Sequence, residues 1–129
     1  MPMPLHIRVD PELEVIFVEG KGIVTDDDLL DYVHEYLGRG GLHGYDELFD
    51  LSAADLLDVT PIGLSSVAEA AVATDSQAEP TKIAILVSET LGMGLSRIYQ
   101  SLREAKGGRR QTRVFRDRAE CQEWLELTP

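Results

Sequence analysis

Thr60 is the residue whose type and position most directly suggest chemistry. It precedes Pro61 and an apolar pattern with helical spacing, so we expect its hydroxyl at a helix N-terminus. Free N–H groups and the helix dipole favour an anion there, which makes Thr60 a possible phosphoacceptor. However, Pro61 removes one N–H group, and Asp55 and Asp58 would repel a phosphate. The residues therefore favour the simpler interpretation, in which Thr60 caps the helix.

Other reactive side chains occur without a pattern that indicates a site. The acidic run Asp26–Asp28 is explained by the first turn of a helix, where carboxylates are favoured. Cys121 falls at a helical core position, and the nearby Asp117 and Glu120 oppose an activated thiolate. No metal-ligand spacing relates the three histidines, His6, His34 and His43.

Two glycine-flanked segments are candidates for phosphate binding. Gly92-Met93-Gly94 follows a predicted strand, but Arg97 stands where a dinucleotide fingerprint needs a third glycine. Arg109-Arg110 could contact a phosphate or a headgroup from its loop. The chain also lacks the Gly-x-Ser-x-Gly elbow of many hydrolases. We therefore expect no catalytic residues, no cofactor and no metal.

Strand-like and helix-like segments alternate along the chain. Alternating and fully apolar runs predict strands at 5–9, 13–18, 23–24, 48–51, 83–87 and 113–115. Apolar positions at helical spacing predict helices at 25–37, 60–72, 91–106 and 117–125, capped at Thr25, Thr60 and Asp117. In the third helix the buried stripe is expected to be Leu91, Leu95, Ile98, Leu102 and Ala105.

This element order predicts the fold class. The expectation is one α/β domain over residues 1–129, with a mixed, mostly parallel sheet of four to five strands. An N-terminal antiparallel hairpin and about four helices complete it. Ligands and partners of such sheets meet the carboxyl ends of the strands, so the loops 52–60 and 88–93 should form one rim. The candidate interaction residues there are Asp50, Ser52, Asp58, Ser88, Met93 and Arg97.

Composition excludes several classes of protein. The 129 residues carry a formal net charge of −11, which opposes general binding to nucleic acid or to anionic membranes. A single cysteine, Cys121, excludes an internal disulfide and a cysteine-based zinc cluster. No apolar run is long enough to span a bilayer, and the N-terminus does not resemble a signal peptide. We therefore expect a cytoplasmic protein.

The charge is unevenly distributed. Residues 1–80 contain 3 basic and 17 acidic groups, a net of −14, whereas residues 81–129 contain 9 basic and 6 acidic groups, a net of +3. Seven basic residues fall between Arg103 and Arg118. This run is either a solvated loop beside a helix end or a basic face that meets an acidic face on a second copy or a partner.

Several segments resemble a known family. Asp50-Leu51-Ser52, then Asp58 and Thr60 at a helix start, resemble the Asp-Leu-Ser and Asp-Ser-Ser-Gly signature of STAS domains. These are bacterial anti-sigma-factor antagonists and sulfate-transporter tails. The ending 113–125 resembles a STAS-like subgroup of mostly small uncharacterised bacterial proteins, which share their fold with CRAL-TRIO lipid-binding domains.

The resemblance has consequences for Thr60 and for function. In the antagonists, a kinase phosphorylates the serine that corresponds to Thr60; here Val59 and Pro61 depart from the signature. The resemblance implies a non-enzymatic regulatory or protein-interaction module. The alternative is a carrier or sensor of a small apolar or lipid-like ligand. A protein partner or self-association, with a homodimer as the expected form, is consistent with either function, and no nucleic acid is expected.

Overall fold

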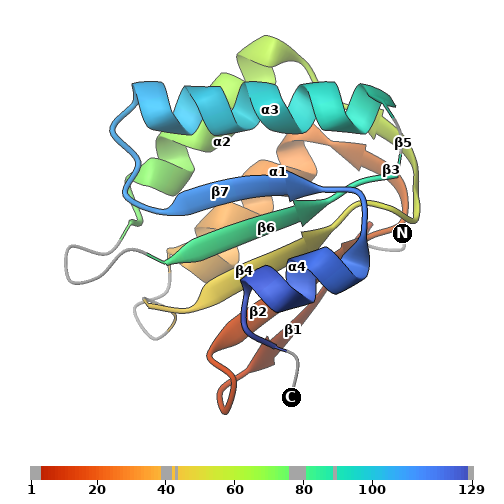
Figure 1. Ribbon diagram of the computed structural model, residues 1–129. Helices are drawn as coiled ribbons and strands as arrows, with labels where there is room; N and C mark the ends of the chain where they lie inside the picture. The colour runs from red at the N-terminus through yellow and green to blue at the C-terminus, as the bar shows by residue number, and fades with distance from the viewer. Residues whose placement is uncertain (1–3, 39–41, 43, 76–80, 89, 128–129) are drawn as a thin grey trace.

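The computed structural model describes residues 4–38, 42, 44–75, 81–88 and 90–127. Its main sheet has five strands in the order β1-β2-β4-β6-β7 (Figure 1). Strands β1 and β2 form an antiparallel hairpin, and the remaining neighbours are parallel. The strands are β1 (Leu5–Asp10), β2 (Val15–Gly20), β4 (Asp46–Asp50), β6 (Lys82–Leu86) and β7 (Gln111–Phe115). The predicted mixed sheet with an N-terminal hairpin is confirmed.

Helices lie on both faces of this sheet. On one face are α1 (Asp26–Tyr32), which continues into the π-helical turn η1 (Val33–Leu37), α2 (Pro61–Val72) and α3 (Thr90–Ala105). The opposite face carries α4 (Arg118–Trp124) (Figure 1). None of the described helices has both the length and the apolar character needed to cross a membrane.

The predicted helix caps are confirmed. The side chain of Thr25 accepts a hydrogen bond from the Asp28 backbone N–H at 3.2 Å, and Asp28 returns the contact in a capping box. The Thr60 hydroxyl accepts from the Gly63 N–H at 2.9 Å, and the Asp117 carboxylate accepts from the Ala119 N–H at 3.0 Å. These side chains satisfy N–H groups that have no partner inside the helix.

A second, two-stranded sheet was not predicted. The loop expected at 52–60 contains β5 (Ala54–Asp58), which pairs in parallel with β3 (Gly22–Thr25). The segment Ala54–Asp58 has acidic residues at two of its five positions and exposes most of its side chains, so it shows no strand periodicity. Its extended conformation depends on hydrogen bonds to β3, which a local pattern does not reveal.

The buried face of α3 also differs from the prediction. Leu91 is 60% exposed and Ile98 is 40% exposed, while Gly92, Ser96 and Arg103 are buried. A Cβ atom at Gly92 would lie only 3.1 Å from the Val87 Cβ, so the helix packs closely on the end of β6. Because glycine permits this close approach, α3 turns the side that carries Gly92 toward the sheet. The side that carries Leu91 and Ile98 faces solvent instead.

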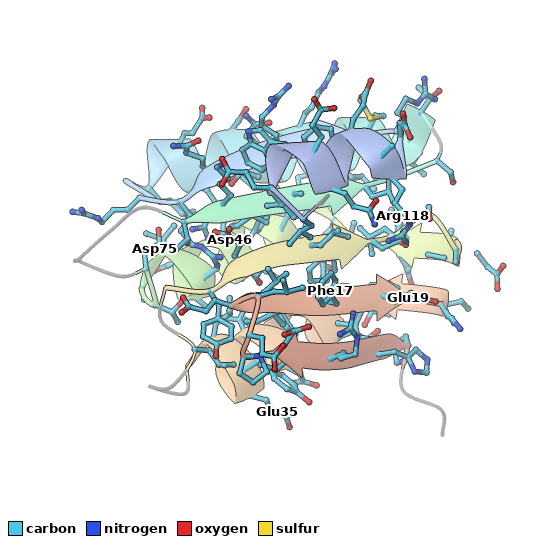
Figure 2. The ribbon with its side chains drawn as sticks, turned by 60° about the horizontal axis from the view of Figure 1, so that its bottom comes forward. Phe17, Glu19, Glu35, Asp46, Asp75 and Arg118 are labelled. Carbon is cyan, nitrogen blue, oxygen red and sulfur yellow. The ribbon has the colours of Figure 1, made fainter. Side chains whose placement is uncertain are left out.

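The second face of the sheet is covered only in part. Leu48, Ala84, Leu86 and Phe115 pack there against Cys121 and Leu125. Burial raises the pKa of the Cys121 thiol to about 11, which keeps it protonated, as its core position suggested. Beside α4, Phe17 and Glu19 line an open groove of about 250 Å³ on β2 (Figure 2).

Candidate functional site

Three polar residues meet at the carboxyl ends of β4 and β6, as the topology predicts. The buried Asp50 carboxylate accepts hydrogen bonds from the Ser52 backbone N–H at 2.8 Å and from the Ser52 hydroxyl at 2.5 Å. The Ser88 hydroxyl donates to the Ser52 carbonyl oxygen at 3.2 Å. Arg118 donates to the other Asp50 oxygen. The Ser88–Ser52 hydrogen bond therefore joins the loops 52–60 and 88–93. Both carboxylate oxygens of Asp50 have partners within the chain.

Thr60 lies at the same rim, exposed, at the start of α2. Its hydroxyl donates to Asp26 Oδ2 at 3.1 Å while it accepts from Gly63. Its backbone N–H also donates to the Asp26 carboxylate, at 3.2 Å to Oδ1. The sequence interpretation assigned Asp26 only to the first turn of α1; the structure shows that it also binds the beginning of α2.

The Asp26 carboxylate occupies the space in front of α2. A Cβ atom at Gly63 would collide with this carboxylate, so the carboxylate lies directly against the first turn. The positive end of a helix dipole favours an anion there, and Asp26 supplies one from within the chain. A phosphate on Thr60 would have to displace Asp26. A local signal of this contact was Gly63 itself, because glycine is unfavourable inside a helix and here leaves room for the carboxylate.

The remaining candidate rim residues are separated. Asp58 ends β5, opposite Thr25, and is exposed. Met93 is half-buried against the cluster of Ile83, Ile85 and Val87. Arg97 is exposed on the outer side of α3, beyond the first turn. These three side chains therefore do not form one site with Asp50 and Ser52, although all belong to elements that start or end at the rim.

Exposed apolar side chains gather on the rim. Six large hydrophobic residues of the described chain are strongly exposed, and four of them belong to β3, β5 and the first turns of α2 and α3. We call these four residues the rim patch: Ile23, Leu56, Ile62 and Leu91. Ile23 and Leu56 are paired in register, and Leu56 and Leu91 line one groove of about 50 Å³. Leu56 and Leu91 fall within the rim loops 52–60 and 88–93 that the sequence predicts, whereas Ile23 and Ile62 lie outside them.

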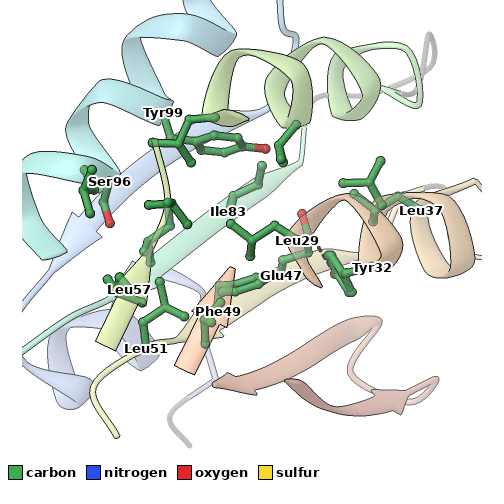
Figure 3. A pocket seen from close by; sticks show the side chains of 17 residues that line it. Leu29, Tyr32, Leu37, Glu47, Phe49, Leu51, Leu57, Ile83, Ser96 and Tyr99 are labelled. Carbon is green, nitrogen blue, oxygen red and sulfur yellow. Dashed lines mark hydrogen bonds between the residues drawn. The ribbon is translucent and has the colours of Figure 1, made fainter. Parts of the chain in front are cut away.

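An apolar cavity lies beneath the rim. It has a volume of about 80 Å³ and is enclosed by α1, η1, α2 and α3 on one side and by the main sheet on the other (Figure 3). Leucine, isoleucine, valine and phenylalanine side chains form most of its wall. Its polar lining residues are Tyr32, Glu47, Ser96 and Tyr99.

A buried hydrogen-bonded cluster closes one part of this cavity. Glu47, which is 2% exposed, accepts hydrogen bonds from the Tyr32 hydroxyl and from Arg110. Arg110 also donates to the Tyr45 carbonyl oxygen at 2.8 Å and to the Thr81 hydroxyl at 2.5 Å. Burial and the neighbouring Glu47 raise the pKa of Tyr32 well above its ordinary value.

A second buried ion pair lies where α2 and α3 end. Arg103 and Asp75 are 2.6 Å apart, and their side chains are 2% and 3% exposed. Burial opposes the charge on Arg103, but Tyr99 and Asp75 raise the pKa of its guanidinium. Burial also raises the pKa of Tyr99, although Arg103 acts in the opposite direction. Asp75 additionally accepts from the Arg109 backbone N–H at 2.7 Å.

These pairs correct the prediction for three of the seven residues in the basic run. Arg103, Arg110 and Arg118 bind Asp75, Glu47 and Asp50, so each pair joins the basic part of the chain to its acidic part. Asp75 and Arg118 lie at opposite ends of the main strands, so pairing occurs at both ends of the fold (Figure 2). Arg110 is consequently not available to bind a phosphate, whereas Arg109 is exposed.

Comparison with known proteins supports the fold. No family model and no curated protein matches the sequence. Among solved structures, the chain is similar to an uncharacterised protein from the DUF3478 family with a SpoIIAA-like fold, from Shewanella loihica. The two are 14% identical, with a TM-score of 0.57 over 94% of this chain and 91% of that chain. The chain therefore has the SpoIIAA-like, or STAS-like, fold that its element order resembles.

Proposed function

We propose that this protein is a non-enzymatic interaction module that docks a partner protein on the rim patch. The observation that carries the proposal is the gathering of Ile23, Leu56, Ile62 and Leu91, which are 49% to 83% exposed. Contiguous exposed apolar residues with a polar border are typical of protein-binding surfaces. The polar groups nearby, Asp50, Ser52 and Ser88, are bonded to one another and hold the loops in place.

The surroundings of the patch suggest the chemistry of the partner. Asp55 and Asp58 are exposed on β5, and Asp27 is exposed in the first turn of α1, which directly follows β3. A partner that offers apolar side chains surrounded by Lys or Arg would complement both the patch and its acidic border. Phosphorylation of Thr60 would add charge here and displace Asp26, so we propose it as the regulatory event if a kinase acts on this protein. We place this module in a bacterial cytoplasm.

The test compares two exposed leucines. Leu56 lies in the rim patch, whereas Leu13 is similarly exposed, at 51%, in the β1–β2 turn. A partner captured from cells by the wild-type protein is identified, purified and titrated by calorimetry against Leu56→Asp and Leu13→Asp. We expect Leu56→Asp to weaken binding by about ten-fold or more, as loss of a central apolar contact does, and Leu13→Asp to bind normally. Equal binding by both variants would reject the rim patch as the docking surface.

The apolar cavity supports a second candidate function, a sensor of a small apolar molecule. Its volume of about 80 Å³ is below the roughly 150 Å³ of a cavity known to hold benzene, so a lipid would require the helices to move apart. Native mass spectrometry of the purified protein would reveal a retained molecule. Ser96→Leu should fill the cavity and abolish that binding; a ligand that survives this substitution must lie elsewhere.

A further inference from the structure

The outer side of α3 carries a regular row of exposed residues. We call these the α3 stripe: Gly94, Arg97, Ile98, Ser101, Glu104 and Ala105. Its uncharged members, Gly94, Ile98, Ser101 and Ala105, follow one another at spacings of four, three and four residues. The average spacing of about 3.7 residues is close to one helical turn, so these positions lie in line along one side of α3. Within the described residues, this side of α3 faces solvent.

Gly94 is not explained by contacts within its own chain. A Cβ atom at Gly92 would lie 3.1 Å from the Val87 Cβ, whereas one at Gly94 would meet nothing within 4 Å. Gly94 also lacks the positive φ that would require glycine. Since glycine destabilises a helix relative to alanine, Gly94 needs another reason. A second helix that approaches α3 closely supplies one, because small residues let the two backbones come together.

The charges of the stripe indicate which helix would pack against it. Its charged members, Arg97 and Glu104, stand seven residues apart along one edge. A second α3 in the antiparallel direction places Arg97 of each copy opposite Glu104 of the other. In a parallel pair related by a two-fold axis, this edge of the two helices would fall on opposite sides of the contact, so Arg97 and Glu104 of the two copies would not meet. A two-fold axis perpendicular to the helices relates two antiparallel copies of α3. The stripe of one copy is therefore complementary to the stripe of the other.

We propose that two copies of this chain form a symmetric dimer through antiparallel α3 stripes. In this dimer Ala105 faces Gly94 of the second copy, and Ile98 lies beside Ser101 near the axis. Leu91 lies one turn before Gly94, at the end of this contact, whereas the other three residues of the rim patch belong to elements other than α3.

Charge reversal provides the principal test. The molecular mass of the purified protein is measured by sedimentation equilibrium over a wide concentration range, for the wild type, Arg97→Glu, Glu104→Arg and the double variant. Each single substitution turns two attractions into repulsions, so we expect dimerisation to weaken by about ten-fold, and the double variant to restore it. A monomeric wild type, or a dimer that the reversals do not change, would overturn the proposal. Circular dichroism checks that each variant is folded.

A disulfide tests whether the α3 stripes of two copies meet near Ser101. Ser101 lies near the proposed axis, so Ser101→Cys should form a covalent dimer on mild oxidation. Glu123→Cys, exposed on α4, is the matched control and should remain monomeric under the same conditions. Cys121 is buried and does not interfere. Absence of the covalent dimer in Ser101→Cys, or equal cross-linking of both variants, would contradict contact through the α3 stripes. Ala105→Cys tests the direction, because the antiparallel pair separates the two copies of residue 105, so a covalent dimer of Ala105→Cys would contradict the antiparallel arrangement. Leu56→Asp should dimerise normally, which separates this proposal from docking at the rim patch.

Discussion

The Asp26 carboxylate accepts hydrogen bonds from both the backbone N–H and the hydroxyl of Thr60, thirty-four residues further along the chain. This contact ties the end of β3 to the beginning of α2. It also fills the position at the helix N-terminus that a phosphate on Thr60 would occupy. The carboxylate also lies directly against Gly63, so a substitution at Gly63 should disturb the contact between Asp26 and Thr60.

Gly63→Ala should therefore destabilise the protein, although alanine is the better helix former. Its methyl group would push the Asp26 carboxylate away from Thr60, at a cost of about 1–2 kcal/mol in the free energy of unfolding. Urea denaturation measures this change. In an Asp26→Ala background the same substitution should become neutral or stabilising, because the obstacle is gone. An equal cost in both backgrounds would show that Asp26 is not responsible.

Breaking the buried Glu47–Arg110 pair should be far more costly than breaking the pair at the rim. Glu47→Ala leaves Arg110 buried without its anion, so we expect a loss of about 3–5 kcal/mol. Arg118→Ala is the control: Arg118 is 49% exposed and the buried Asp50 keeps its two hydrogen bonds from Ser52, so this loss should cost about 1 kcal/mol or less. Urea unfolding of the two variants compares these costs, and similar values would contradict the structural difference.

Stability should fall at alkaline pH. The pKa values of Tyr32 and Tyr99 are raised in the folded protein, so the unfolded chain loses these protons first, near pH of about 10. Above that pH the unfolded state binds fewer protons, and the free energy of unfolding decreases as pH rises. Tyrosinate absorbance should show two of the four tyrosines ionising together with unfolding. Four tyrosines that titrate normally before unfolding would contradict this prediction. Tyr32→Phe should reduce the pH dependence.

Gly92 and Gly94 should respond to alanine in opposite ways. Gly92→Ala places a methyl group against Val87 and should cost about 1–3 kcal/mol of stability. Gly94→Ala points into open space and should stabilise the monomer by about 0.5–1 kcal/mol through helix propensity. Thermal unfolding at low protein concentration separates the two. A destabilised Gly94→Ala monomer would show that the glycine has a role within its own chain.

Sequence patterns were reliable where the structure depends on neighbours in the chain. The hairpin follows from alternation in 5–9 and from a turn at Asp10, and β6 follows from five successive apolar residues. The caps at Thr25, Thr60 and Asp117 follow from side chains that bond to N–H groups within three residues. Each of these interactions is local, so the residue types nearby were sufficient to predict it.

Contacts between distant segments were not predictable in the same way. Strand β5 forms because β3 lies beside it, and the buried side of α3 is selected by Gly92 packing on Val87. The rim patch likewise combines single exposed residues from four elements. None of these features has a signal within its own segment, because each depends on which side chains the fold brings within a few ångströms.

The charge distribution shows most clearly how local sequence patterns differ from contacts between distant segments. The sequence by itself determined that residues 1–80 carry a net charge of −14 and residues 81–129 a net charge of +3. Only the tertiary structure decided that Arg103, Arg110 and Arg118 meet acidic partners inside the same chain. The physical reason is that a charge count ignores distance, whereas the energy of an ion pair depends on separation and on exclusion of water. Both quantities are set by the packing of α2, α3, α4 and the sheet.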